Sequence, residues 1–548
     1  MSWQSYFKRY KASFSFVGLV FAALLFAGSL SPSLLPRHYV VQGILSGMST
    51  AVGYGMGVFF LWLWQYLELL SPSEGLQRTA KRVSVAVVTI LAVSFLWRAA
   101  VWQNSIRSLM EMPPLETAYP FRVAVITLFF GSFLVAGGRL VGRCWSYLAN
   151  KLRRILPRRV ANVLSVVVVS VLVIFIANGV FAKAALKFAD ATFLHMDGLI
   201  DEGVEQPTEA MATGSKESLV SWDSIGRQGK DFISLGPTQE AISEFWNQEA
   251  KRPLRVYVGL GSKETSQERA KLALEELKRV GAFERSLLVV ATPTGTGWLD
   301  PGAVDTLEYL HAGDTAIVSM QYSYLPSWIT ILIDPNRSRV AARHLFNEVY
   351  AYWTALPKAE RPQLYLHGLS LGSLGSESSA ELITIYEDPI QGALWSGPPF
   401  PSTAWAAITR GRNPDSPAWL PKIRDGRMIR FTGQENSLDL DGAEWGPIRT
   451  VYLQHASDPM IFFSPSLLYR RPDWLIGERG PDVSPYLDWY PVVTFLQVAF
   501  DLPMATSIPI GYGHNYSPAG YINAWLEVTD VKNWSEDDSR RLLKVLAK

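Results

Sequence analysis

The chain has 548 residues, of which 48% are hydrophobic and only 18% are charged, less than the roughly 25% typical of soluble domains. A single cysteine excludes an internal disulfide framework and a zinc site built from several thiolates, and 51 basic against 49 acidic residues exclude the strong basic excess of a nucleic-acid-binding protein. We therefore expect a membrane protein with a soluble part, with no metal and no other cofactor.

Long apolar runs separated by short basic loops occupy the chain before about residue 190. Five of them approach or exceed the roughly 18 residues that cross a bilayer: Phe14–Leu30, Ile44–Leu70, Val83–Val101, Val123–Val141 and Val163–Ala185. The alternative for the first run is a cleaved signal peptide, since basic residues precede it. In the second run, Gly43, Gly47, Ala51 and Gly55 are four residues apart, which favours close helix packing in lipid. The sequence predicts an α-helical transmembrane bundle over residues 1–188.

Basic residues gather in the N-terminus and in the second and fourth loops between the runs. The positive-inside rule places these segments on the cytoplasmic side. Five spans that start there put the C-terminal part on the opposite side. The polar stretch 189–250 lacks periodicity and is expected to be a surface-running linker and domain entry.

Short β-branched runs alternate with helical stretches in residues 251–548. Helices are expected at Gln267–Val280, at Arg339–Ala355, from about Leu371 and at Ser535–Ala547. Strands are expected at Leu254–Gly259, Ser286–Ala291, Thr315–Met320, Gln363–His367, Gly392–Ser396, Met428–Thr432 and Thr450–Gln454. Apolar strands separated by helices indicate a mostly parallel sheet covered on both faces.

The sequence Gly368-Leu369-Ser370-Leu371-Gly372 lies between an expected strand and an expected helix. A G-x-S-x-G motif in that position is typical of a nucleophile elbow, in which glycines relieve the crowding around a strained serine. Gly375 lies on the same helix face as Gly372 and is expected to let the helix approach the sheet. The alternative is an ordinary turn rich in glycine and serine.

A serine needs a base that is oriented by a carboxylate. Only two histidines follow Ser370 in the sequence. His514 lies in a glycine-flanked loop near the end of the domain and is the expected base. His455 would be the base only if Asp439 or Asp441 were the acid.

Asp458 is the expected acid, because it follows a late strand and precedes His514 in the order serine, acid, histidine. Its alternative is a structural Asp-Pro turn. Three other carboxylates compete for the role: Asp439, Asp441 and Asp482.

An oxyanion hole requires donors aimed at the charge that develops during attack. The amide of Leu371, directly after the serine, is the first expected donor. The glycine-containing loop after Ser286–Ala291 supplies the others, with Thr294, Gly295 and Thr296 as candidates. The loop Gly259–Ser262 is a second, lesser candidate.

Aromatic side chains in two further sequence blocks are candidates for a substrate pocket. Tyr322, Tyr324 and Trp395 would offer apolar area with a polar group to an acyl chain or a sugar. The alternative is that they pack within the protein.

Several sequence blocks carry a resemblance to a known family. They are SWDSIGRQG at Ser221–Gly229, GPT at Gly236–Thr238, PTGTGWLDP at Pro293–Pro301, QYSYLPSW at Gln321–Trp328, GLSLGS at Gly368–Ser373 and WSGPP at Trp395–Pro399. Together they resemble the bacterial α/β-hydrolase family with a transmembrane N-terminal region. The resemblance implies an α/β-hydrolase fold with Ser370 as nucleophile. It supplies neither a substrate nor a role for the other blocks.

We therefore predict a membrane-anchored serine hydrolase of a bacterial inner membrane, with its catalytic domain extracytoplasmic. Its partners would be the lipid bilayer and an ester that is lipid-linked or derived from the envelope. The alternatives are an acyltransferase that uses the same triad and a non-enzymatic, partner-binding membrane module. The sequence does not indicate an oligomeric state.

Overall fold

The computed structural model describes residues 14–70, 72–176, 192–193, 196–379, 388–440 and 442–547. The chain divides into two compact units. The helical unit comprises Met1–Leu186, Phe463–Leu475 and Pro481–Met504, and the α/β unit comprises Lys187–Phe462, Ile476–Gly480 and Ala505–Lys548. The expected domain 251–548 is thus interrupted, because most of residues 463–504 groups with the N-terminal helices.

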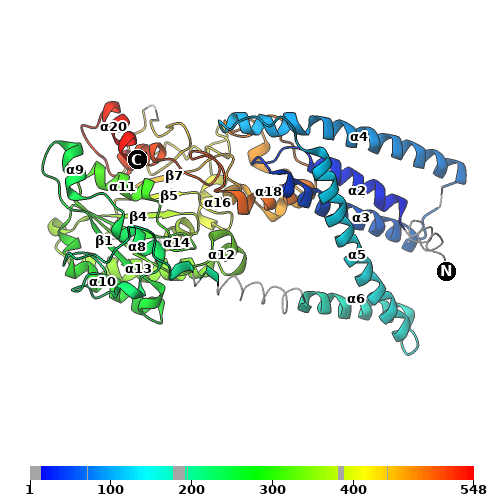
Figure 1. The fold of residues 1–548 in the computed structure, drawn as a ribbon, viewed down its shortest axis with the longest axis horizontal. Coiled ribbons are helices and arrows are strands. Elements are labelled where there is room, and N and C mark those ends of the chain that lie inside the picture. Colours follow the sequence, from blue (N-terminus) through cyan, green and yellow to red (C-terminus); the bar gives the residue numbers. More distant parts are fainter. Residues whose placement is uncertain are drawn as a thin grey trace. The chain divides into compact units, whose positions relative to one another are not determined.

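A seven-stranded sheet forms the centre of the α/β unit (Figure 1). Every pairing is parallel, and the strand order is β1-β3-β2-β4-β5-β7-β6. The strands are β1 (Leu254–Val258), β2 (Leu287–Thr292), β3 (Thr315–Met320), β4 (Gln363–Leu369), β5 (Gly392–Ser396), β6 (Ile429–Thr432) and β7 (Arg449–Leu453). All seven lie where the sequence predicts them. Strand β6 precedes β7 in the chain yet takes the edge, so β7 lies beside β5.

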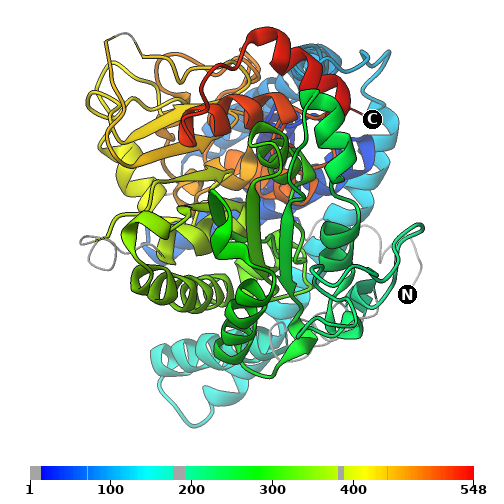
Figure 2. The same ribbon diagram turned by 90° about the vertical axis from the view of Figure 1, so that its left-hand side faces the viewer.

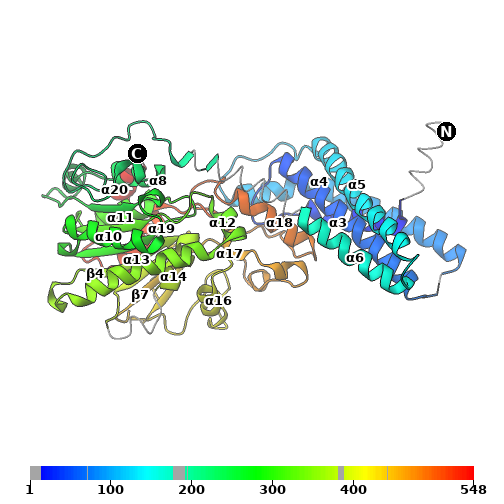
Figure 3. The same cartoon turned by 90° about the horizontal axis from the view of Figure 1, so that it is seen from below.

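Helices cover both faces of this sheet (Figures 1 and 2). One face carries α10 (Ser266–Arg279), α13 (Asn336–Ala355) and α14 (Leu371–Ser379), of which α13 and α14 lie side by side in Figure 3. The other carries α11 (Pro301–Leu310) and α19 (Pro518–Val528), with α20 (Glu536–Leu546) packed on them. Every residue of β2 and β3 is buried, as expected for parallel strands covered on both faces.

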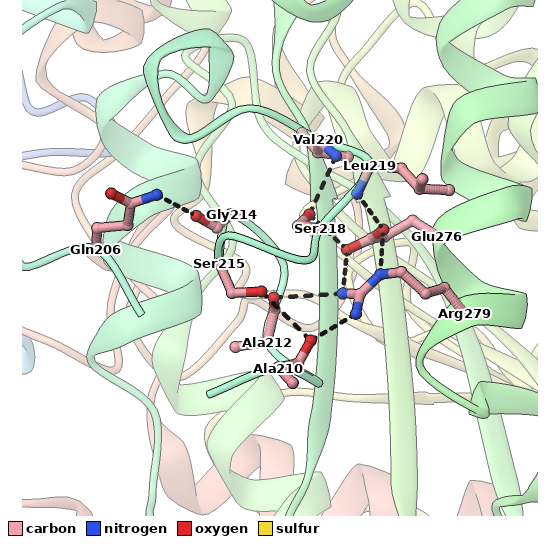
Figure 4. A network of polar contacts seen from close by, with 10 residues as sticks. All are labelled: Gln206, Ala210, Ala212, Gly214, Ser215, Ser218, Leu219, Val220, Glu276 and Arg279. Atoms are coloured by element: carbon pink, nitrogen blue, oxygen red, sulfur yellow. Dashed lines mark hydrogen bonds and ion pairs between the residues drawn. The ribbon is translucent and has the colours of Figure 1, made fainter. Parts of the chain in front are cut away.

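The segment expected as a surface-running linker is instead packed against the α/β unit. It contains η2 (Trp222–Ser224), α8 (Arg227–Ser234) and α9 (Gln239–Trp246). Figure 4 shows how its first part is fixed on α10: the Glu276 carboxylate accepts hydrogen bonds from Ser218 Oγ at 2.7 Å and from the Leu219 amide at 3.0 Å. Arg279 donates to the Ala210 carbonyl at 2.5 Å. The expectation failed because these elements are too short to show a periodic pattern.

The helical unit contains α2 (Phe16–Ser29), α3 (Tyr39–Tyr66), α4 (Glu74–Leu109), α5 (Pro120–Leu152), α6 (Arg158–Ile174) and α18 (Val493–Asp501). Among the described residues, α3, α4 and α5 are long and apolar enough to cross a membrane. The 14 residues of α2 rise only about 21 Å, less than the roughly 30 Å hydrocarbon core. Helix α6 has 17 residues, and the end of the fifth predicted run, up to Ala185, lies outside the described residues. The structure therefore supports three of the five predicted spans.

Small residues bring the helices of this unit close together, in part as predicted. A Cβ at Gly47 of α3 would lie 3.1 Å from the backbone nitrogen of Gly131 in α5. A Cβ at Gly53 would lie 2.5 Å from a backbone oxygen of α2. Gly55 has no neighbour within 4 Å, so it takes no part in this packing.

The late segment of the helical unit is joined to α2 and the turn after it by buried polar contacts. The Asp501 carboxylate, at the end of α18, accepts hydrogen bonds from the amides of Leu34 at 3.2 Å and Leu35 at 3.4 Å. Gln497 Nε2 donates to the Ser31 carbonyl at 2.9 Å. The two Asp501 bonds pair the amides of Leu34 and Leu35 in the turn after α2, and the Ser31 carbonyl accepts from both Gln497 and Arg37 Nη2.

Candidate active site

Ser370 joins β4 to α14 in the strained conformation expected of an elbow. Its φ is +58°, which side chains other than glycine rarely adopt, and its amide donates to the Ser396 carbonyl at 3.0 Å. A Cβ at Gly368 would lie 2.4 Å from the carbonyl group of Gly372, so the first glycine is required by this turn. Ser370 is 2% exposed. Its Oγ makes no hydrogen bond to any residue that the structure describes.

The glycines that follow have roles that differ from the expected one. A Cβ at Gly372 would lie 2.1 Å from the Thr292 carbonyl oxygen, at the end of β2. A Cβ at Gly375 would lie 2.3 Å from Ser338 Oγ on α13. Gly372 therefore permits the approach of α14 to the sheet, and Gly375 permits its approach to the neighbouring helix.

Asp458 and His514 form a hydrogen-bonded pair next to the sheet. Asp458 Oδ2 lies 2.6 Å from His514 Nδ1 and also accepts from Tyr516 Oη at 2.7 Å. Asp458 Oδ1 accepts from the Met460 amide at 2.8 Å. Asp458 is fully buried and His514 is 7% exposed. The Nδ1 contact leaves His514 Nε2 as the nitrogen available for proton transfer.

Of the other candidates, His455, Asp439 and Asp482 are not in this position. His455 Nδ1 bonds the Gly513 carbonyl at 2.9 Å, and its ring stacks on Tyr516 with centroids 4.4 Å apart, so it supports the loop that carries His514. Asp439 interacts electrostatically with Arg430, and Asp482 belongs to the helical unit. Asp441 lies outside the described residues.

Three neighbouring strands bring the serine and the histidine toward one another. Strands β4, β5 and β7 are adjacent, and their carboxyl ends lead to Ser370, to Ser396–Gly397 and to Asp458. The Ser396 carbonyl accepts the Ser370 amide, and a Cβ at Gly397 would lie 2.6 Å from His514 Cε1. One peptide unit therefore touches both residues. Like Ser370 Oγ, His514 Nε2 is buried without a hydrogen-bond partner in the described part of the chain.

Gly397 is a site residue to which the sequence analysis assigned no role. It belongs to the WSGPP block, has a φ of +54°, and leaves room for the imidazole of His514. The sequence shows only a glycine directly after a predicted strand. Its contact with His514 could not be predicted without knowing that β5 and β7 are neighbours in the sheet.

The expected oxyanion donors divide into two groups. Leu371 is the first residue of α14, so its amide has no acceptor within the helix. The amide of Thr294 donates to the Trp298 carbonyl at 2.9 Å, and that of Gly295 to Ser327 Oγ at 3.0 Å. Both amides are thus engaged inside the protein, contrary to expectation. The hydroxyls of Thr294 and Thr296, 3.3 Å apart, remain as side-chain donors.

The aromatic residues expected to line a pocket are mainly packed within the fold. Tyr322 is buried, and its hydroxyl donates to the Pro293 carbonyl at 3.1 Å. Trp395 Nε1 donates to Ser376 Oγ at 3.0 Å, and its ring lies 5.3 Å from that of Tyr452. Tyr324 is half-buried. Tyr322 and Trp395 therefore have structural partners in place of a substrate.

A buried carboxyl on the nucleophile helix was not anticipated. Burial raises the pKa of Glu377 on α14 to about 7, although the Ser402 hydroxyl, which donates to it, opposes the shift. Within the described ranges, no group of three or more His, Cys, Asp or Glu side chains is placed to hold a metal ion.

Comparisons with known proteins match both parts of the chain. Residues 254–542 match a family described as "Alpha/beta-hydrolase family", and residues 30–237 match "Alpha/beta-hydrolase family N-terminus". No curated protein matches the chain. One solved structure, from work on LipS and LipT, two metagenome-derived lipolytic enzymes, aligns with 48% of this chain and 95% of its own, at 13% identity and a TM-score of 0.15. A likeness at that score says nothing about the activity of this chain.

Proposed function

The chain belongs to the alpha/beta-hydrolase family, and on that premise we propose that it is a membrane-anchored serine hydrolase that cleaves an ester of a lipid or envelope component. The observation that carries the proposal is the buried Asp458–His514 pair, whose histidine touches the peptide unit that also holds Ser370. A strained serine, an imidazole and a buried carboxylate are the parts that acyl transfer requires.

In the proposed reaction, Ser370 Oγ attacks the ester carbonyl while His514 Nε2 takes the hydroxyl proton. The Asp458 carboxylate keeps the Nδ1 proton of His514 in place and stabilises the imidazolium. The Leu371 amide donates to the oxyanion of the tetrahedral intermediate. When the tetrahedral intermediate collapses, the alcohol leaves and takes the proton from His514, which leaves the acyl group on Ser370. Water, deprotonated by His514, then attacks this acyl-enzyme and releases the acid. Ser370 Oγ and His514 Nε2 have no hydrogen-bond partner among the described residues, and catalytic hydrogen bonds commonly form only when a substrate binds.

The membrane part of the proposal rests on α3, α4 and α5. Their apolar side chains are largely exposed, as in Trp97, Phe121 and Phe129, which suits contact with lipid tails. If these three helices alone span, the basic residues in the first turns of α4 and at the end of α5 place the α/β unit in the cytoplasm. If α2 and α6 also span, it lies outside. We propose the five-span arrangement in a bacterial inner membrane.

A pair of C-terminal fusions tests the side of the membrane. Alkaline phosphatase at the C-terminus should be active and green fluorescent protein there should be dark if the α/β unit is extracytoplasmic. The opposite pair of results would replace the five-span arrangement with the three-span one.

A fluorophosphonate probe on the purified full-length protein tests the enzymatic proposal. Wild type should be labelled at Ser370, and Ser370→Ala should not be labelled. Ser378→Ala is the matched control, because it removes a hydroxyl of the same helix whose partner among the described residues is the Gly375 carbonyl. Absence of labelling in wild type would favour a partner-binding module. Products formed from a labelled ester with and without an added alcohol separate hydrolysis from acyl transfer.

A further inference from the structure

The loop after β2 is seated in the turn that follows β3. Tyr322 Oη donates to the Pro293 carbonyl at 3.1 Å, and Ser327 Oγ accepts the Gly295 amide at 3.0 Å. A Cβ at Gly295 would lie 2.5 Å from the Leu325 carbonyl oxygen, so the two backbones are in direct contact. The PTGTGW and QYSYLPSW blocks, which the sequence left without a role, thus form one structure.

Tyr257 on β1 and the buried Gln321 contact the far end of the same loop. Tyr257 Oη donates to the Gly297 carbonyl at 2.7 Å, and a Cβ at Gly297, whose φ is +89°, would lie 3.0 Å from Gln321 Cγ. Gln321 is itself fixed, since its Oε1 accepts the Leu260 amide at 3.0 Å and its Nε2 donates to both carboxylate oxygens of Asp197 at 3.1 Å.

The beginning of the loop lies against the helix that carries the serine. A Cβ at Gly372 would be 2.1 Å from the Thr292 carbonyl oxygen and 2.8 Å from that of Pro293. Leu371, whose amide is the proposed oxyanion donor, directly precedes this contact. The Thr294 and Thr296 hydroxyls are therefore carried by a loop that is fixed beside the nucleophile and supported at both ends.

We propose that residues 321–327 are a positioning element, in which Tyr322 and Ser327 fix the loop so that a hydroxyl of Thr294 or Thr296 joins the Leu371 amide in the oxyanion site. This inference rests on the proposed function. The Thr294 and Gly295 amides are used in holding the loop, so its hydroxyls supply the donors. A rotatable hydroxyl stabilises an oxyanion well only when its Cα is held in place.

The rate of phosphonylation measures the oxyanion site directly. In this reaction the Ser370 Oγ–P bond forms, the P–F bond breaks, fluoride leaves, and the serine proton passes to His514, while negative charge grows on the phosphoryl oxygen. Ser327→Ala and Tyr322→Phe should each lower the labelling rate constant tenfold to about a hundredfold. Both should lower kcat for a p-nitrophenyl ester similarly and leave KM unchanged. Ser327→Thr, which keeps the hydroxyl, should recover the rate.

Removal of the donors themselves should have a larger effect. The double variant Thr294→Val, Thr296→Val should lose about 10²- to 10³-fold in kcat, the usual cost of one oxyanion donor. Thr354→Val is the matched control, because its hydroxyl lies on α13 and donates to the Tyr350 and Ala351 carbonyls of its own helix, away from residues 321–327. Thr354→Val should label at the wild-type rate.

The outcomes separate this inference from the proposed function. If wild type is labelled but Ser327→Ala and Tyr322→Phe, folded with wild-type melting temperatures, label at its rate, the positioning role is wrong and the hydrolase remains. A rise in KM at constant kcat would also overturn the role. If wild type itself is not labelled at Ser370, the proposed function fails, and this inference fails with it.

Discussion

Asp458 accepts three hydrogen bonds, from His514, Tyr516 and the Met460 amide, and this set fixes both of its oxygens. Asp458→Asn keeps the shape but removes the charge, and its amide group favours the wrong tautomer of His514. We expect kcat to fall by up to about 10⁴-fold with the fold retained. Steady-state ester hydrolysis and far-ultraviolet circular dichroism on the same preparation measure both quantities.

Asp439→Asn is the control for that substitution, since Asp439 lies in the electrostatic surroundings of Arg430, whereas the histidine is paired with Asp458. It should hydrolyse the ester at the wild-type rate. Near-normal turnover in Asp458→Asn together with a loss in Asp439→Asn would move the acid to another loop.

Glu377 gives a prediction about stability and pH. Its pKa in the folded protein is about 7, above its ordinary value near 4.5, because burial disfavours the charged form. The protonated carboxyl therefore contributes stability that is complete below pH 4.5 and is lost as the pH rises to 7. Glutamine mimics the neutral acid, so relative to Glu377→Gln the melting temperature of wild type should fall between pH 4.5 and 7.

Glu244→Gln, at an exposed position on α9, makes the same change of charge. Its melting temperature should change with pH in the same way as that of wild type. A difference in melting temperature between Glu377→Gln and wild type that stays constant from pH 4.5 to 8 would contradict the assigned pKa.

For single residues, the sequence predicts the conformation and role of those that lie within a short motif. Ser370 lies in an elbow because five consecutive residues determine the turn, and the histidine that pairs with Asp458 is the one expected. Gly397 and Tyr516 touch His514 or Asp458 only through tertiary adjacency. The amides of Thr294 and Gly295 were misjudged for the same reason: their acceptors come from a backbone turn and from a separate block.

At the scale of elements, a buried ion cluster joins β1 to α8 and α11. Arg255 donates to Glu308 through Nε at 2.8 Å and Nη2 at 2.7 Å, and to the Phe232 carbonyl at 2.6 Å. Arg255→Met would leave the fully buried Glu308 carboxylate without its partner. We expect a loss of about 3–5 kcal/mol in the free energy of unfolding, measured by urea titration.

The exposed pair Lys251–Asp314 provides a comparison, and Lys251→Met should cost no more than about 1 kcal/mol. The triple variant Arg255→Met, Asp305→Asn, Glu308→Met should recover much of the loss, because both carboxylates that pair with Arg255 are then removed and no charge of the cluster remains. A triple variant as unstable as Arg255→Met would show that packing, and not the uncompensated charge, causes the effect.

The strands were predictable because each is a short run of mostly apolar or β-branched residues between helical stretches, and parallel strands are buried on both faces. Their lateral order was not, since β6 passes outside β7 although it precedes it. Because β7, and not β6, pairs with β5, the end of β7 and the following Asp458 lie beside the end of β5. The helices in residues 222–246 were missed because segments of eight residues or fewer carry too few turns for a periodic signal.

At the scale of the whole molecule, the two units are interleaved along the chain. A fragment of residues 196–548 would retain 463–504 without the turn after α2, whose backbone groups Asp501 and Gln497 bond. We expect this fragment to aggregate when expressed alone and to become soluble when residues 1–186 are supplied as a separate chain. Size-exclusion chromatography of both preparations in detergent measures this.

A monodisperse, esterase-active fragment obtained without the helices would show that the α/β unit folds independently of them. The interleaving itself was not predictable, because residues 463–504 contain no run long enough to suggest a span and lie between two elements of the α/β unit.

The bonds between Asp501 and the turn at Leu34 and Leu35 also set an order of events during biosynthesis. The partners at Leu34 are 467 residues apart in the chain. At the usual 5–20 residues per second, a ribosome needs roughly 25 to 90 s to pass from one to the other. The first helices are therefore made and wait, with these amides without their Asp501 partner, while most of the α/β unit is translated. The helical unit begins first and is completed almost last, only after residue 501 has emerged.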